Sequence, residues 1–150
     1  MRLLRSYPVY FLKDTLNENK VIIHTDGAAR GNPGPAAIGI IIKDENGKLI
    51  ARISRCIGTT TNNQAEYQAI ITALEKAISL SVKHVVLKSD SELVIKQING
   101  QYKIKNMALR PLYQRVVHLI GSLESFSISY IPREQNAAAD ALANEALDNL

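Results

Sequence analysis

The chain has 150 residues, enough for one domain with a buried core of its own. With 46% hydrophobic and 21% charged residues it has the composition of a soluble globular protein, and we find no apolar run of membrane-spanning length and no signal-peptide pattern. A single cysteine excludes an internal disulfide or a cysteine zinc cluster, so we expect a protein of the reducing cytoplasm in which Cys56 is a small buried side chain.

The net charge of +4 is modest, but the bases are unevenly distributed. Residues 83–115 hold the seven bases Lys83, Lys88, Lys96, Lys103, Lys105, Arg110 and Arg115. The acids in this span are Asp90 and Glu92. Such a basic span is typical of a surface that meets phosphate, although a solvated helix face explains several of these lysines equally well.

The first nineteen residues form an extension of unknown role, in which the apolar residues 7–12 fit a short edge strand or a packed arm. Strands are predicted at 21–26, 36–43 and 49–57, with the Asn46-Gly47 pair closing a hairpin between the last two. Consecutive strands joined by short turns predict an antiparallel meander.

Helices alternate with strands in the second half of the chain. Helical periodicity, caps and breakers predict helices at 64–80, 91–98, 109–123 and 137–150. Two further strands are predicted at 84–90 and 126–131. The pattern predicts an α/β fold in which a mixed sheet is flanked by helices, in one domain over residues 20–150.

Four carboxylates occupy prominent places in these elements. Asp26 ends the first strand, before a segment rich in Gly, Asn and Pro, and Asp90 ends the fourth strand. Glu66 lies on the stripe of the long helix that faces the sheet, and Asp140 begins the last helix. Each has a structural interpretation too: a hairpin turn for Asp26, a helix cap for Asp90, a capping box with Asn63 for Glu66, and compensation of the helix dipole for Asp140.

Taken together, the four acids indicate a metal site. If the first and fourth strands are neighbours, Asp26 and Asp90 leave the sheet side by side and Glu66 faces them from a helix. Carboxylates gathered in this way repel one another unless a cation compensates their charge. Oxygen ligands without His or Cys favour Mg²⁺ or Mn²⁺ over zinc, and two such ions beside a basic surface are typical of phosphodiester chemistry.

Four motifs resemble those of type 1 ribonuclease H, a family that cuts the RNA strand of RNA–DNA hybrids. They are, in the family's order, residues 25–35, 61–67, 89–94 and 136–143, so that the resemblance covers about residues 20–150. It implies a ribonuclease H-like fold, with a five-stranded mixed sheet of three antiparallel strands followed by parallel strands, flanked by helices.

The resemblance also implies a role for each acid. Asp26 would bridge two Mg²⁺ ions, for which Mn²⁺ is a possible substitute. With Asp140 it would hold the ion that activates the attacking water. With Glu66 and Asp90 it would hold the ion that stabilises the leaving 3′ oxygen. The products would carry 5′-phosphate and 3′-hydroxyl ends. The alternative is a catalytically inactive hybrid-binding module of the same fold, which the loss of any of these acids would have favoured.

Substrate contacts follow from the same resemblance. The backbone at Gly27 and the side chains of Asn32, Asn62 and Asn63 would lie in the minor groove of the hybrid. The phosphate of the DNA strand would be bound by Thr61 and Asn106. Turn and cap chemistry explains the asparagines equally well.

One departure from the family's bacterial members concerns substrate binding. Those proteins carry a basic, often Trp-rich protrusion, but residues 100–109 are too few for it and the chain has no Trp. Affinity for long hybrids would then be weaker, or would rest on Lys96, Lys103, Lys105 and the N-terminal arm.

A second departure concerns the loop at 131–136, where relatives often place a histidine that aids proton transfer or product release. Here Arg133 would steady phosphate charge but cannot shuttle protons, and a structural role is expected for His24, although it shares a strand face with Asp26. Both departures resemble the archaeal branch of the family, some of which also cut double-stranded RNA; we expect a monomer that does not engage membranes.

Overall fold

The chain folds around one sheet, and the computed structural model describes it from residue 19 to residue 150. The elements expected before residue 19 lie outside the described residues. The strands are β1 (Lys20–Ala29), β2 (Gly34–Asp44), β3 (Leu49–Thr60), β4 (His84–Ser89) and β5 (Ser125–Tyr130). The helices are α2 (Asn62–Ser79), α3 (Glu92–Ile98), α4 (Arg110–Ile120) and α5 (Ala137–Asp148), with a 3₁₀ turn, η1, at Arg133–Asn136.

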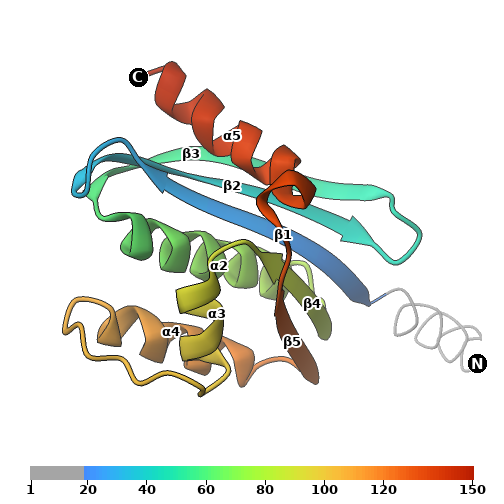
Figure 1. The fold of residues 1–150 in the computed structure, drawn as a ribbon. Coiled ribbons are helices and arrows are strands. Elements are labelled where there is room, and N and C mark those ends of the chain that lie inside the picture. The colour runs from blue at the N-terminus through green and yellow to red at the C-terminus, as the bar shows by residue number, and fades with distance from the viewer. Residues whose placement is uncertain (1–18) are drawn as a thin grey trace, which may run out of the picture.

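The strand order across the sheet is β3-β2-β1-β4-β5 (Figure 1). The pairs β1–β2 and β2–β3 are antiparallel, whereas β1–β4 and β4–β5 are parallel. This confirms the predicted five-stranded mixed sheet, and it makes the first and fourth strands neighbours, as the predicted metal site requires. None of the helices within residues 19–150 is both long enough and apolar enough to cross a bilayer.

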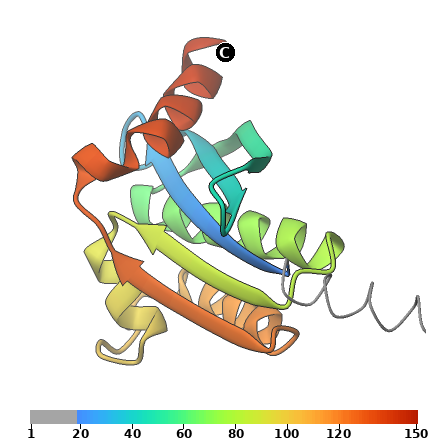
Figure 2. The same ribbon diagram turned by 90° about the vertical axis from the view of Figure 1, so that its right-hand side faces the viewer.

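Helices cover the two faces of the sheet unequally. The helices α2, α3 and α4 lie on one face, and α5 crosses the other (Figures 1 and 2). The main core lies on the α2 side, where Ile38, Ile40 and Ile42 of β2 pack with Ile70 and Leu74 of α2, all of them fully buried. Each such side chain contributes about 1.5–3 kcal/mol by leaving water. This packing fixes α2, and with it Glu66, against the middle of the sheet.

The first strand is longer than its sequence predicts. Asp26 does not end β1, because β1 stays paired with β2 as far as Ala29 and Ala36. Nor does the segment from Asp26 form a hairpin turn. Residues such as Gly27, Ala28 and Ala29 carry little strand propensity, so pairing with β2 rather than local preference keeps them extended.

Two other expectations are wrong. Cys56 is exposed rather than buried, because it lies on the edge strand β3. Its Sγ donates a 3.1 Å hydrogen bond to the carbonyl of Ala146 in α5. The helix predicted at 109–123 ends at Ile120.

Candidate active site

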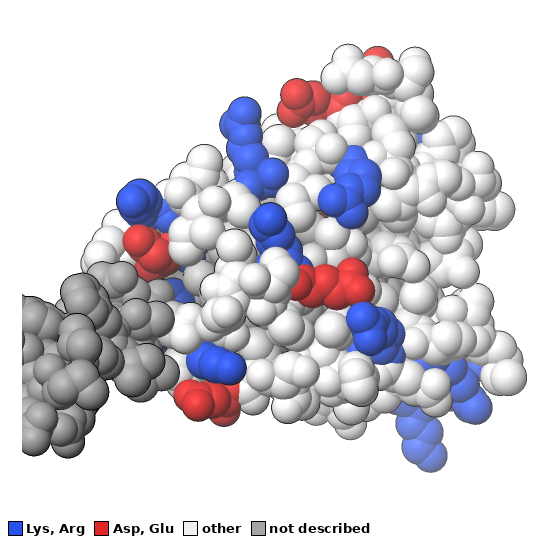
Figure 3. Space-filling view, turned by 180° about the vertical axis from the view of Figure 1, so that it is seen from behind, with Lys and Arg blue, Asp and Glu red and all other residues white. Residues whose placement is uncertain are grey.

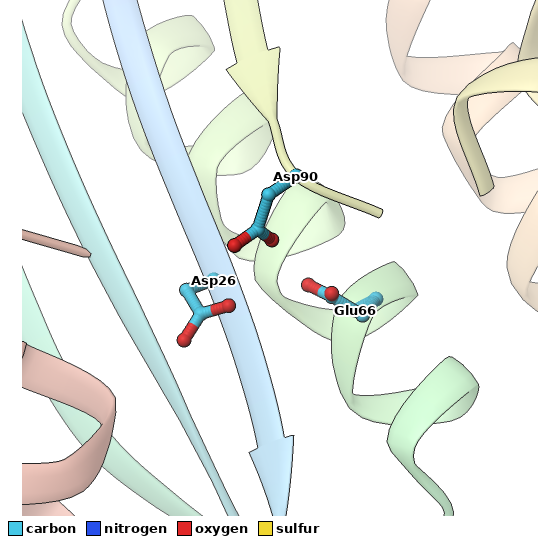
Figure 4. Close-up of side chains that lie close together, drawn as sticks. All are labelled: Asp26, Glu66 and Asp90. Carbon is cyan, nitrogen blue, oxygen red and sulfur yellow. The ribbon is translucent and has the colours of Figure 1, made fainter. Parts of the chain in front are cut away.

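Three carboxylates meet where the parallel pairing of β1 and β4 ends. Asp26, Glu66 and Asp90 each present an oxygen atom that lies within 4.8 Å of the corresponding atoms of the other two. The three side chains come from β1, from α2 and from the loop after β4, and they point toward one another (Figure 4). The sequence-predicted convergence of these acids is therefore present in the structure.

The parallel pairing of β1 and β4 explains how two of the acids meet. The last paired residues are His24 of β1 and Lys88 of β4. Asp26 and Asp90 each follow two residues later, so equal steps along two neighbouring strands bring both carboxylates to the same height. Because the pairing has ended there, the space between the two chains is available to the side chains.

Glu66 reaches this point because α2 approaches β1 closely at Gly27. A Cβ atom on Gly27 would lie 2.2 Å from the carbonyl carbon of Ala65, so no larger residue leaves room for the helix. The Gly27 amide donates a 2.8 Å hydrogen bond to Glu66 Oε1, which orients the carboxylate. The cap of α2 is Thr61, in a capping box with Gln64, so Glu66 has no capping function.

Asp140 adds a fourth acid from the opposite face of the sheet. It lies in the first turn of α5 and lines the same 330 Å³ cavity as the other three carboxylates. The guanidinium of Arg133 lines this cavity too, with Nη2 3.7 Å from Asp140 Oδ1, and its side chain is 78% exposed. One cavity is thus lined by four acids and by one long, exposed basic side chain.

Burial and mutual repulsion raise the pKa values of three of these acids. Burial and the charges of Asp90 and Asp140, together with a hydrogen bond to Asp140, raise the pKa of Asp26 to about 7, against a smaller opposing effect of Arg133. Burial, and to a smaller extent the charge of Asp26, raise the pKa of Glu66, and the hydrogen bond from the Gly27 amide partly offsets this rise. Burial also raises the pKa of Asp90. The ionised cluster therefore needs a compensating cation.

The donor set fits hard divalent cations. All the cavity's candidate ligand atoms in Asp26, Glu66, Asp90 and Asp140 are carboxylate oxygens, the ligand type of Mg²⁺ and Mn²⁺. The half-buried His24 is not among the cavity residues. Its pKa is lowered by burial and by the charges of Lys88 and Lys43, as befits a neutral side chain outside the ligand set.

The predicted groove residues gather beside the acids. Asn62 lines the cavity and its Oδ1 accepts a 2.9 Å bond from the Ala29 amide, while Asn32 Oδ1 accepts a 3.0 Å bond from the Asn62 amide. These bonds tie the β1–β2 turn to the start of α2. The two asparagines thus have a structural role in addition to the predicted one, and the half-buried Asn63 follows them on the first turn of the helix.

Asn106 stands apart from this group. It lies in the connection between α3 and α4, where its Oδ1 accepts a 2.8 Å bond from the Ala108 amide, and it does not line the acidic cavity. The same connection, residues 99–109, contains no helix, in agreement with the expected lack of a protrusion. Of its neighbours, Lys96 is paired with Glu92 at 2.7 Å, whereas Lys103 lines a separate 430 Å³ cavity.

Two residues near the acids had no predicted role. Asn136 is 1% exposed and donates a 2.9 Å hydrogen bond from Nδ2 to the carbonyl of Thr25, which joins the loop before α5 to the strand that carries Asp26. Tyr130, at the end of β5, lines the cavity and is half exposed. Only the tertiary contact with β1 reveals the burial of Asn136.

Comparison with known proteins identifies the family. A family model described as "Reverse transcriptase-like" matches residues 24–146. The crystal structure of RNase H1 from the halophilic archaeon Halobacterium salinarum superimposes with a TM-score of 0.85 at 44% identity, covering 87% of this chain and 99% of that one. This chain belongs to the type 1 ribonuclease H family.

Two further ribonuclease H structures resemble it closely. The N-terminal RNase H domain of a Mycobacterium tuberculosis protein has a TM-score of 0.83 at 37% identity, over 86% of this chain and 99% of that one. LC11-RNase H1, solved in complex with an RNA/DNA hybrid, has a TM-score of 0.82 at 43% identity, over 86% and 97%. Our chain spans 65% of the full length of the Halobacterium ribonuclease HI and 36% of the mycobacterial protein.

Proposed function

We propose that this protein is a metal-dependent endoribonuclease that hydrolyses the RNA strand of RNA–DNA hybrids and leaves 5′-phosphate and 3′-hydroxyl ends. The observation that carries the proposal is the cavity in which four carboxylates converge beside Arg133. Membership of the ribonuclease H family supports it, and so does the hybrid bound to LC11-RNase H1. The catalytic domain would cover residues 20–150.

Two divalent ions, Mg²⁺ or Mn²⁺, would be held by the four acids and would supply an activated water and charge stabilisation at the leaving 3′ oxygen. Asp26 lies between the two parts of the acid cluster: Glu66 and Asp90 are on one side of it, and Asp140 packs against it from α5. This placement suits Asp26 for bridging both ions.

The residues of the chain would orient the substrate and hold its charge. The fork of Arg133, exposed at the mouth of the cavity, is placed to meet a phosphate oxygen. The amide of Gly27 already donates to Glu66, so its part in binding RNA would be the bare backbone surface. Asn62 and Asn32 border this surface, whereas Thr61, which precedes Asn62, would bind a phosphate of the DNA strand. Such short polar groups suit a wide, shallow minor groove.

The alternative is an inactive hybrid-binding module. All four acids are present and gathered in one cavity, which favours the enzyme.

We also propose that the protein acts as a monomer in the cytoplasm and that double-stranded RNA is a second substrate. The absence of a helical protrusion at residues 99–109, where some relatives carry their substrate handle, agrees with the archaeal-like branch to which this activity was assigned.

The test is cleavage of labelled substrates by the Asp26→Asn protein. RNA–DNA hybrid, duplex RNA and duplex DNA are incubated with Mg²⁺, Mn²⁺ or a chelator, and products are separated by length. We expect Asp26→Asn to lower the rate on hybrid by at least about 10³-fold while hybrid binding survives, because it removes the shared ligand but not the groove. Asp148→Asn, at the far exposed end of α5, is the matched control and should cleave normally.

Two results would contradict the proposal. A wild-type rate for the Asp26→Asn protein would exclude the metal mechanism. Tight hybrid binding by the wild-type protein without cleavage in either metal would identify the inactive module instead.

A further inference from the structure

Half of the sheet's second face is not covered by α5. The helix begins above the row of Asp26 and Gly39, where the carbonyl of Ala139 lies against Gly39, and it runs on toward Cys56 and Ala146. The other half of that face lies on β4, on β5 and on the parts of β1, β2 and β3 that lie beyond the row of Asp26 and Gly39, and no described helix covers it (Figure 2).

Strand register gives the side chains of this uncovered half, here named the open sheet face. The row next to Asp26 runs straight across all five strands through paired residues: Arg52, Ile41, His24, Lys88 and Ser129. The next row contains Lys43, Ile22, Val86 and Ser127. Partners in a ladder project to the same side of a sheet, so these side chains form one continuous surface that adjoins the catalytic carboxylates.

The open sheet face is positively charged. Lys43, Arg52 and Lys88 form no ion pair with any residue between 19 and 150. Strands are about 4.8 Å apart, so three interstrand steps separate the backbones of Arg52 and Lys88 by about 14 Å. Apart from the catalytic carboxylates that the face adjoins, acids lie at its far margin, where Glu45 pairs with Lys20 and Glu124 with His84.

The wider surface has the same sign of charge. Seen from behind, the molecule presents more Lys and Arg than Asp and Glu (Figure 3). The three cations surround a small apolar centre of Ile22 and Val86, and serine hydroxyls follow along β5. The cations suit the phosphates of a nucleic-acid strand, and the apolar and hydroxyl groups suit the sugars between them.

We propose that the open sheet face binds the phosphates of a single strand that continues from the hybrid beyond the catalytic carboxylates. Among the described residues, the open sheet face has no Phe, Tyr or Trp on which a base would stack, and its imidazole, His24, is half-buried. Binding there is therefore electrostatic, independent of sequence and sensitive to salt. A single strand fits better than a duplex because a flexible chain can follow the surface, whereas a duplex is stiff over about 150 base pairs. The face thus extends the footprint that the missing protrusion would otherwise supply. This inference rests on the proposed function in one respect, since it takes the hybrid at the carboxylates as its starting point.

The experiment compares two labelled hybrids with the full chain in chelator, so that binding is measured by fluorescence anisotropy without cleavage. One hybrid has blunt ends and the other carries a single-stranded DNA extension, placed at each end in turn. We expect the wild-type protein to bind one extended hybrid about tenfold more tightly than the blunt one. The triple variant Lys43→Gln, Arg52→Gln, Lys88→Gln should lose that difference.

Salt dependence provides the second readout. A contact to a single strand adds about 0.7 to the slope of log affinity against log salt, so removing three contacts should lower the slope for the extended hybrid by about 2. The blunt hybrid should keep its slope. A control with the same charge change on other surfaces, Lys76→Gln, Lys83→Gln, Arg115→Gln, should behave as wild type, and equal melting temperatures would show that both variants fold.

Several outcomes would overturn the inference. One is that the triple variant loses affinity equally for the blunt and the extended hybrids, and another is that the wild-type protein prefers neither extended hybrid to the blunt one. A third is that the wild-type protein is a dimer, and the triple variant is monomeric but binds every hybrid as before, which would assign the face to a second copy of the chain. If the wild-type protein fails to bind the blunt hybrid but binds free single-stranded DNA through the three cations, the proposed function fails while this surface stands.

Discussion

At the scale of single residues, Arg133 is the cavity side chain whose role is most open to test. It lies in the turn before α5, 78% exposed and 3.7 Å from Asp140. A guanidinium in that place would stabilise phosphate charge as it develops but would transfer no proton. We therefore expect Arg133→Ala to lower kcat roughly tenfold and to change KM by less than about threefold, measured by steady-state cleavage of a hybrid.

Two further variants sharpen this measurement. Arg133→Lys keeps the charge without the fork and should recover part of kcat, whereas Glu134→Ala alters the neighbouring exposed residue and should leave kcat unchanged. A raised KM with an unchanged kcat would make Arg133 a binding residue and remove its catalytic part.

Some residues of the site could be predicted from the sequence and others could not. Acids at strand ends and on a buried helix stripe are conspicuous, because burying a charge is costly, so Asp26, Glu66 and Asp90 could be placed together in advance. Asn136 could not. Its side-chain nitrogen donates to the Thr25 carbonyl, a partner 111 positions away, and local sequence carries no sign of such a contact.

At the scale of elements, two glycines set how closely the helices approach the sheet. A Cβ on Gly27 would lie 2.2 Å from the Ala65 backbone of α2, and one on Gly39 would lie 2.0 Å from the Ala139 carbonyl of α5. Gly27 therefore admits the helix of Glu66, and Gly39 admits the helix of Asp140, from opposite faces. The four acids converge because both approaches are close.

Adding one methyl group at either glycine should push a helix away from the sheet. We expect Gly27→Ala and Gly39→Ala each to lower the free energy of unfolding by about 2–4 kcal/mol, in denaturant melts, and to lower kcat as well. Gly121→Ala is the control: its φ of −60° suits any residue and its nearest contact is 3.2 Å, so it should cost less than about 1 kcal/mol. Equal losses for all three variants would refute the close-approach argument.

The same scale shows why element boundaries were harder to predict than the elements. Periodicity, caps and turn residues located the five strands and the four α-helices between β1 and α5, because apolar side chains must repeat with the period of the element that buries them. The 3₁₀ turn η1 lies in a segment that was expected to be a loop. The end of β1 and the exposure of Cys56 depend on neighbours instead. β2 extends the first strand through Ala29, and α5 leaves the edge strand partly uncovered.

At the scale of the whole molecule, the acid cluster links stability to pH and metal. The pKa of Asp26 is raised from 3.8 to about 7, and those of Glu66 and Asp90 are raised too. Between the unfolded and folded values the native protein holds a proton that the unfolded chain has released. Stability from this source is complete below about pH 4 and is lost as pH rises through 7.

The metal-free protein should therefore melt at a lower temperature at pH 8 than at pH 5.5, by roughly 5 °C, in scanning calorimetry with chelator. Mg²⁺ at pH 8 should restore that loss, since ligand that binds only the native state adds about 2.7 kcal/mol at a hundred times its Kd. Asp26→Asn carries no charge at that position, so it should melt above the metal-free wild-type protein at pH 8 and respond weakly to Mg²⁺. A wild-type melting temperature that rises from pH 5.5 to 8 without metal would contradict the repulsion among these acids, because ionising them would then stabilise the fold.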